Sequence, residues 1–200
     1  MTPRLFLAAL CLAAAPAAAA DFADPTWPCI QRKVGELSIA LMWPHPIEAV
    51  ELDDSTEAAV DLLVSRLTLR RIPVEETEGD ISAFVAAHGG GEPLLGHVYE
   101  RAFHNLAGTR HKIMSGIEEY SLSQIDLSDR IGETRAEMDA IMATDAPDFD
   151  RVDVLEETLD WDERIYDDRR RSLTYVCETP VLLEKRLYAI AQMLAAAVES

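Results

Sequence analysis

The sequence predicts an all-α protein, a helical bundle built on a long antiparallel, coiled-coil-like hairpin (residues 109–144 and 148–178) with an extended N-terminal segment. Apolar residues recur in alternating steps of four and three over two long stretches, as in helices that pack on one another. Strand signals are scarce, because only residues 37–43 have a strand-like alternation, of Leu37, Ile39, Leu41 and Trp43 with Ser38, Ala40 and Met42, and no second such stretch can pair with them. We therefore interpret residues 37–43 as an extended or short helical segment lying against helices.

The first twenty residues have the organisation of a Sec-type signal peptide. Arg4 provides a positive start, and the apolar run 5–15 has the length of a secretory core but is too short to span a bilayer. Small residues end at Ala20, so we expect cleavage there and a mature chain that begins at Asp21. The expected location is the periplasm or the secreted fraction.

The mature chain, residues 21–200, is expected to form a single helical domain. Its length is sufficient for one substantial core. The expected parts are, in chain order, an irregular N-terminal segment (21–53), shorter helices (54–107), the helical hairpin (108–178) and a C-terminal helix (179–200).

The charge of the chain restricts its partners. It has 36 acidic residues against 18 lysines and arginines, a formal net charge of −18. Removal of residues 1–20 takes away only Arg4, which leaves −19 on the mature chain. Such a surface repels nucleic acid and anionic lipid. No stretch after residue 20 is apolar for long enough to span a membrane, so we expect no nucleic-acid partner and no membrane insertion after signal cleavage.

Two short helices are predicted before the hairpin. Asp54 followed by Glu57 resembles a capping box with aspartate in the capping position, and Ile72-Pro73 should end this first helix. A second helix is predicted over residues 75–88. The glycines at 89–91 should stop it, as glycines beyond a helix end commonly do.

The predicted hairpin depends on two heptad patterns that match each other. The first runs from Ile113 to Ile141 and the second from Val152 to Pro180, with a break at Ala146-Pro147 between them. If the chain folds at that break, residues whose numbers add up to 293 face each other. This one offset pairs nine layers, among them Met138 with Leu155. Each arm of about 33 residues would be about 50 Å long.

A separate C-terminal helix is expected after the hairpin. Thr179 can cap it, and Pro180 suits its first turn because proline is favoured there. Leucines and an isoleucine at 183, 187, 190 and 194 would form its buried face.

The middle of the hairpin is polar. The offset places Gln124 opposite Arg169, and Asp162 beside Arg130. This layer can be a polar pocket for a partner, or a register-setting layer with Arg130–Asp162 and Asp126–Arg169 ion pairs. We favour the register-setting interpretation.

The cysteines predict a disulfide. Signal cleavage removes Cys11 and leaves Cys29 and Cys177, an even pair in an oxidising compartment. We predict that these two are bonded, so that Trp27-Pro28-Cys29 is tied across the base of the bundle. Gly116 on the opposite arm would give the N-terminal segment room to lie close.

Two sets of residues point to metal handling instead. Cys29 and His45 each follow a Trp-Pro pair, and His97, His104 and His111 lie seven residues apart on one helix face. Residues seven apart on a helix are about 10.5 Å apart along the axis, too far for one ion to bridge. The Trp-Pro pairs are also explained as anchors of the N-terminal segment. We therefore predict no metal site and no cofactor.

No catalytic motif is present in the sequence. It contains no Cys-x-x-Cys, no Gly-x-Ser-x-Gly and no glycine-rich phosphate loop after a strand. We therefore expect a secreted or periplasmic, non-enzymatic interaction or accessory protein. Its partner would be another periplasmic protein, bound through the helical hairpin with its acidic tip. The alternative is a periplasmic copper- or zinc-handling protein that uses Cys29 and His45 or the three histidines.

Overall fold

The computed structural model describes residues 24–198, and the predicted signal peptide lies outside this part of the chain. The helices are η1 (Ile39–Leu41), α1 (Asp54–Thr68), η2 (Val74–Thr77), α2 (Glu78–His88), α3 (Glu92–Met142) and α4 (Phe149–Val198). Residues 24–198 contain no strand. The predicted all-α class is confirmed.

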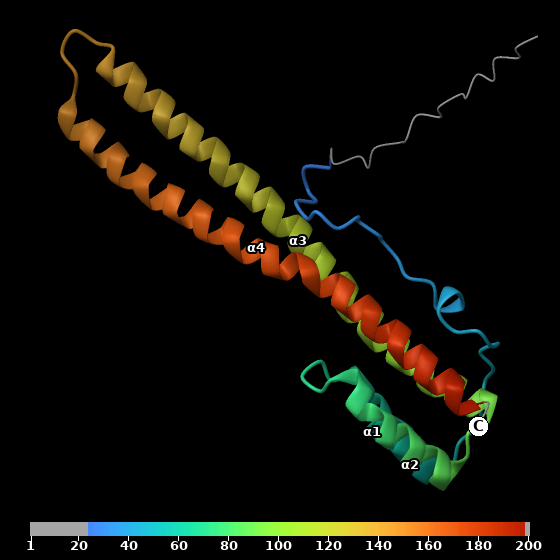
Figure 1. Cartoon of the computed structure of the whole chain (residues 1–200). Coiled ribbons are helices and arrows are strands. Elements are labelled where there is room, and N and C mark those ends of the chain that lie inside the picture. The colour runs from blue at the N-terminus through green and yellow to red at the C-terminus, as the bar shows by residue number, and fades with distance from the viewer. Residues whose placement is uncertain (1–23, 199–200) are drawn as a thin grey trace, which may run out of the picture.

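Two long helices dominate the molecule (Figure 1). Helices α3 and α4 have 51 and 50 residues, run antiparallel and are joined by residues 143–148. At 1.5 Å per residue each is about 75 Å long, which exceeds the predicted arm of about 50 Å. The hairpin is longer because α3 already begins at Glu92 and α4 continues to Val198.

The prediction of a separate C-terminal helix at 179–200 is wrong. Pro180 lies inside α4 and is buried, and the apolar face that follows it continues to bury side chains without interruption. A proline inside a helix costs one backbone hydrogen bond. Burial of Pro180 and of leucines 183 and 187 against the neighbouring helices offsets that cost here. Helix α3 likewise continues without a break through Gly108.

The predicted seam between the arms is largely correct. From Ile113 to Ile141 every predicted seam residue of α3 is buried or half-buried. On α4 the exception is Val176, which is 42% exposed, because the neighbouring Cys177 takes the buried position. The ion pairs Arg110–Glu184 and Arg130–Asp162 join the arms at number sums of 294 and 292, close to the predicted 293.

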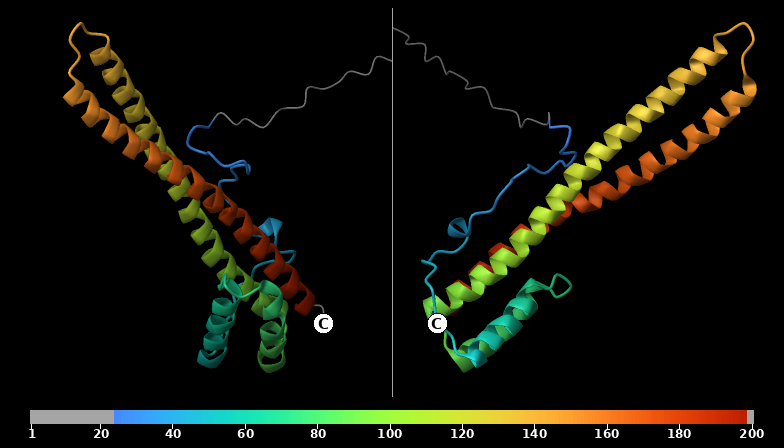
Figure 2. Two further views of the ribbon diagram at one scale, coloured as in Figure 1. Left: turned by 60° about the vertical axis from the view of Figure 1, so that its left-hand side comes forward. Right: turned by 180° about the vertical axis from the view of Figure 1, so that it is seen from behind.

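The main core lies at the open end of the hairpin, where α1 and α2 pack against it (Figures 1 and 2). Residues of all four helices contribute to it, together with Trp43 from the N-terminal segment. The Trp43 ring stacks on Tyr99 with centroids 5.1 Å apart. Gly96 lies beneath the segment, and a Cβ atom there would be 3.6 Å from both Trp43 and Ile47. This distance is an ordinary contact, so the segment leaves room at position 96 for a methyl group but not for a large side chain.

The ends of the short helices differ from the prediction by a few residues. Asp53, not Asp54, caps α1, and its carboxylate accepts hydrogen bonds from the backbone N–H groups of residues 55 and 56. A hydrogen bond from the Ser55 hydroxyl, together with bonds from the backbone N–H and the hydroxyl of Thr56, lowers the pKa of Asp53. Helix α1 ends at Thr68 rather than at residue 72. Past this end, the guanidinium of Arg186 on α4 donates hydrogen bonds to the backbone carbonyls of Leu67 and Ile72, at 2.6 and 2.7 Å.

Helix α2 is preceded by η2, so its regular turns begin at Glu78 instead of residue 75. It ends as predicted, at Gly89, whose φ of +93° lies in the region that favours glycine. Among residues 24–198, no helix combines the length and the apolar composition that a bilayer span requires.

Candidate functional site

The N-terminal segment is tied to the middle of the hairpin by a disulfide. Cys29 and Cys177 are bonded, with Cα atoms 5.5 Å apart, and both are buried with Ile117 of α3. This is the predicted pair. The prediction about Gly116 is wrong, because it is exposed and a Cβ atom there would have open space around it. The segment lies over Ile117 and Ser121 instead.

Hydrogen bonds hold the segment on both sides of the disulfide. The Ser121 hydroxyl donates to the carbonyl of Pro25 at 2.8 Å. The indole N–H of Trp27 donates to the carbonyl of Gln31 at 2.7 Å, which closes a turn around Cys29. Trp27 therefore anchors the segment, as the second interpretation of the Trp-Pro pairs proposed.

An ion-pair network fixes the start of the segment. The Lys33 ammonium lies 2.9 Å from the Asp24 carboxylate and 3.0 Å from that of Glu118 on α3. Hydrogen bonds from Thr26 and Lys33 lower the pKa of Asp24 to about 2. The hydrogen bonds of Lys33 to Asp24 and Glu118 raise the pKa of Lys33. These charges connect residues 24–33 to α3.

A buried arginine provides the next attachment. The Arg110 side chain is 3% exposed, and its Nε lies 2.7 Å from the carboxylate of Glu184 on α4. Its terminal nitrogens donate to the carbonyls of Val34 and Gly35. One guanidinium therefore joins both arms of the hairpin to the N-terminal segment. A buried cation needs such partners, since burial without them is costly.

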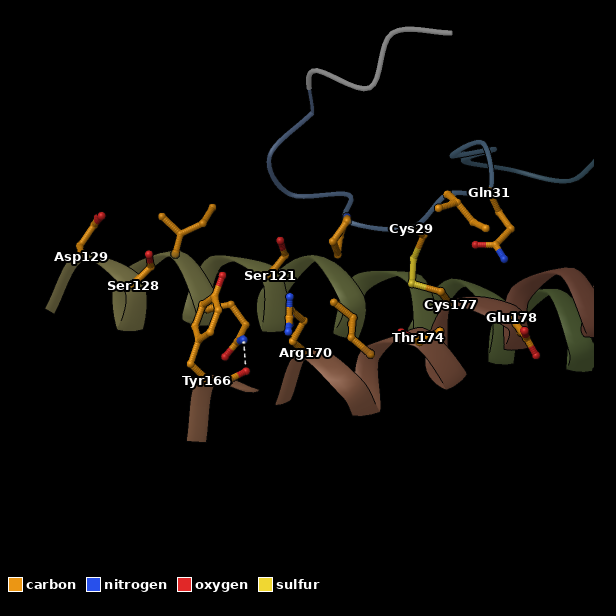
Figure 3. A pocket seen from close by; sticks show the side chains of 15 residues that line it. Cys29, Gln31, Ser121, Ser128, Asp129, Tyr166, Arg170, Thr174, Cys177 and Glu178 are labelled. Carbon is orange, nitrogen blue, oxygen red and sulfur yellow. Dashed lines mark hydrogen bonds between the residues drawn. A yellow bond between two sulfur atoms is a disulfide. The ribbon is translucent and has the colours of Figure 1, made fainter. Parts of the chain in front are cut away.

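A groove of about 540 Å³ opens beside the disulfide (Figure 3). It runs between α3 and α4 from the Cys29–Cys177 disulfide toward Asp129 of α3, and Arg170 and Tyr166 of α4 line it (Figure 3). The Gln124 amide donates to the carbonyl of Tyr166 at 3.2 Å. Residues 28–31 of the N-terminal segment form one wall of the groove.

The polar middle of the hairpin matches one of the two predicted ion pairs. Arg130 lies 3.7 Å from Asp162. The Arg169–Asp126 pair is replaced, since Arg169 donates to the Ser123 hydroxyl at 3.2 Å and lies over the Tyr120 ring. These contacts cross between the arms. They support the register-setting interpretation.

Residues 126–163, which we call the far arm, form an acidic surface. They contain fourteen carboxylates and three arginines, a formal charge of −11. The three arginines all pair inside the arm, as Arg130–Asp162, Arg135–Glu163 and Arg151–Glu137. Eleven carboxylates thus remain without an arginine partner in the far arm. The field around this arm is strongly negative.

Large apolar side chains are exposed on the same arm. Trp161 is 61% exposed and Val154 is 54% exposed. The ends of the two helices at the turn add Met142 and Phe149, also exposed. Four residues of the far arm are buried, namely Leu127, Ile131, Val152 and Leu155, all in the seam. The far arm therefore has a single layer of packing and an outer surface that is both acidic and apolar.

The metal-handling residues do not come together. Cys29 is bonded to Cys177, and the Nδ1 atom of His45 lies 3.5 Å from the Glu92 carboxylate. His104 is exposed near Glu100, at 4.0 Å, and no third ligand joins them. His97 is half-buried and His111 is exposed. Within residues 24–198 no three histidine, cysteine or carboxylate side chains are arranged to hold an ion.

Two features of the site were missed by sequence reasoning. Arg110 lies in the heptad stripe, four residues after Leu106 and three before Ile113, and a charge at such a position signals a buried partner. Val154 and Trp161 are seven residues apart, and that spacing signals a second stripe beside the seam. Both signals are readable in the sequence.

Comparison with known proteins adds no relative. The chain matches no protein-family model, no curated protein and no solved structure. The fold and the surfaces described above are therefore the basis for a function.

Proposed function

We propose that this chain is an exported, non-enzymatic interaction protein that presents the far arm of its hairpin to another protein. The single observation that carries the proposal is the composition of the far arm. It extends away from α1, α2 and the main core (Figures 1 and 2), and it carries exposed Trp161 and Val154 in an acidic surface. Large exposed apolar side chains rimmed by polar groups are typical of protein-binding surfaces.

The opposite end of the hairpin supports a division of roles. The main core, the Arg110 contacts and the disulfide all lie outside residues 126–163. These features stabilise the hairpin from its open end to its middle and leave the far arm free for contact. The signal-like residues 1–20 and the disulfide support export to the periplasm, where disulfides persist.

Shortening both arms tests this function. Residues 128–141 and 152–165 face each other at the offset of 293, so their joint deletion removes two heptads from each arm and keeps the seam in phase. We expect the shortened chain to keep its disulfide and its helical signal. It should lose the complex that the full chain forms in the periplasm of its source cell, measured by chemical cross-linking and native electrophoresis.

A matched control addresses the base of the molecule. Leu62 of α1 is exposed far from the hairpin turn, and Leu62→Ser should leave the complex intact. A complex that persists with shortened arms, or that Leu62→Ser abolishes, would contradict a binding role for the far arm.

A further inference from the structure

We propose that α4 carries a second heptad row, Val154, Thr158, Trp161 and Ile165, that binds a basic amphipathic helix of the partner protein. This inference rests on the proposed function and names the kind of partner that the far arm takes. It concerns the outer side of α4, not the seam with α3.

The row has the geometry of a helix-packing surface. Its residues follow each other in steps of four, three and four, so they share one face of the helix. With 100° per residue, Val154 lies about 100° around the axis from the seam residue Leu155. The row therefore runs parallel to the seam and beside it.

Within residues 24–198, most of this row is left uncovered. Val154 and Trp161 are mostly exposed, Thr158 is exposed, and Ile165 is half-buried. Tryptophan is among the residues that contribute most to binding energy at protein interfaces. In a surface of otherwise charged residues, its exposure indicates a contact with a partner that brings its own apolar side chains.

The charges beside the row indicate which charge the partner's surface should carry. Asp150 and Glu157 flank it on the side away from the seam, and Asp153 and Asp160 lie further round the helix. Two arginines lie near the row: Arg151 pairs with Glu137, and Arg164 is exposed next to Ile165, so carboxylates still outnumber cations there. A helix that docks here meets carboxylates on its exposed edge, so lysines and arginines beside its apolar stripe would complement them.

The same charges argue against a second copy of this chain. Two far arms would each bring a formal charge of −11 to the contact, and like charges placed together are unfavourable. An anionic membrane surface would be repelled for the same reason. A basic helix from a different protein remains the occupant that satisfies both the apolar row and its acidic edge.

A designed peptide provides a direct probe. It has about three heptads, with leucines in one stripe and lysines on both sides of it, and its control has the same composition with the leucines scattered. We expect the striped peptide to bind the full-length protein at least about tenfold more tightly than the scattered one, by calorimetry. Binding should weaken as salt is raised.

Substitutions locate the contact. Trp161→Ser should weaken binding of the striped peptide by at least about tenfold, and Val154→Ser should weaken it in the same direction. The control is Tyr175→Ser, because Tyr175 is exposed two heptads further along α4, outside the far arm. It should change binding less than about twofold. Equal binding of both peptides, or no effect of either far-arm substitution, would overturn the inference.

Different results would refute the proposed function and the proposed binding row. If the native complex is lost when the arms are shortened, but neither Trp161→Ser nor the striped peptide affects it, the far arm binds a partner through another surface. If shortening leaves the native complex unchanged, the proposed function itself is wrong.

Discussion

Arg110 of α3 and Glu184 of α4 form an ion pair whose arginine is buried at the base of the hairpin, with Nε and Oε1 2.7 Å apart. The same guanidinium donates to the carbonyls of Val34 and Gly35. A single side chain thus couples the two arms to a segment that is about 75 residues earlier in the chain. This contact and the disulfide position the N-terminal segment along the hairpin.

Removing the arginine should destabilise the protein. We expect Arg110→Met to lower the free energy of unfolding by about 2–3 kcal/mol, because two backbone carbonyls and Glu184 lose a charged donor. Arg101→Met is the control, since Arg101 pairs with Glu57 and Asp61 at the surface and should contribute at most about 1 kcal/mol. Urea unfolding measures both. Equal effects would contradict a special role for Arg110.

The disulfide should stabilise the fold through the loop it closes. Its cysteines are 148 residues apart, and chain entropy sets an upper limit of roughly 5 kcal/mol for a loop of that length. A reductant should therefore lower the urea midpoint of the native protein. The double variant Cys29→Ser/Cys177→Ser should already have the lower midpoint and should not respond to reductant. A midpoint that reductant leaves unchanged in the native protein would show that the bond contributes nothing.

Gly96 should tolerate a small side chain but not a large one. A Cβ atom there would meet Trp43 and Ile47 at 3.6 Å, an ordinary contact, and alanine favours a helix over glycine by about 1 kcal/mol. Gly96→Ala should thus be neutral or stabilising. Gly96→Leu should overfill the contact and cost about 1–3 kcal/mol.

The control for Gly96 is Gly116, which has open space around it on the same helix. Gly116→Leu should cause no loss of stability. Thermal unfolding of the three variants measures the difference, and a Gly96→Leu protein as stable as Gly116→Leu would show that the N-terminal segment does not pack on Gly96.

Acid should loosen the start of the N-terminal segment. The Asp24 carboxylate has a pKa of about 2 in the folded protein, below the ordinary 3.8, because Thr26 and Lys33 donate hydrogen bonds to it. Ionised Asp24 therefore stabilises the folded segment above pH 3.8, and this stabilisation is lost as the pH falls toward 2. NMR titration of the labelled Asp24 carboxyl measures the midpoint, and a value near 3.8 would contradict the network.

An Asp24→Asn variant provides the matched comparison. It lacks the titrating group, so amide exchange at Trp27, whose N–H donates to the carbonyl of residue 24, should be faster than in the native protein at pH 5. Between pH 5 and pH 2 the difference between the two proteins should shrink.

The seam of the hairpin was predictable because the two heptad patterns can be tested against each other. Two heptad patterns that match at one offset fix the register of the two arms. Leu127 and Leu155 are buried, as that register requires. Helix ends depend on single residues, which packing can override. Pro180 reads as a helix start but is buried inside α4, and Asp54 reads as a cap although its neighbour Asp53 makes the bonds.

The contacts of the N-terminal segment were only partly predictable. The Cys29–Cys177 bond follows from an even cysteine count, and this count does not say which surface the segment crosses. The segment packs on Ile117 and Gly96 through apolar contacts, and single donors such as Ser121 bind its carbonyls. Such three-dimensional choices leave no periodic signal in the sequence.

The central claim is that the far arm contacts a partner through the outer face of α4. Thr158 and Ser172 test it as a pair, because both are exposed and lie two heptads apart on the same face of the helix. A photo-cross-linking amino acid placed at either position in the source cell reports which part of that face touches another protein. We predict a discrete protein adduct from position 158 and none from position 172. Adducts from position 172 alone, or from neither position, would contradict the claim.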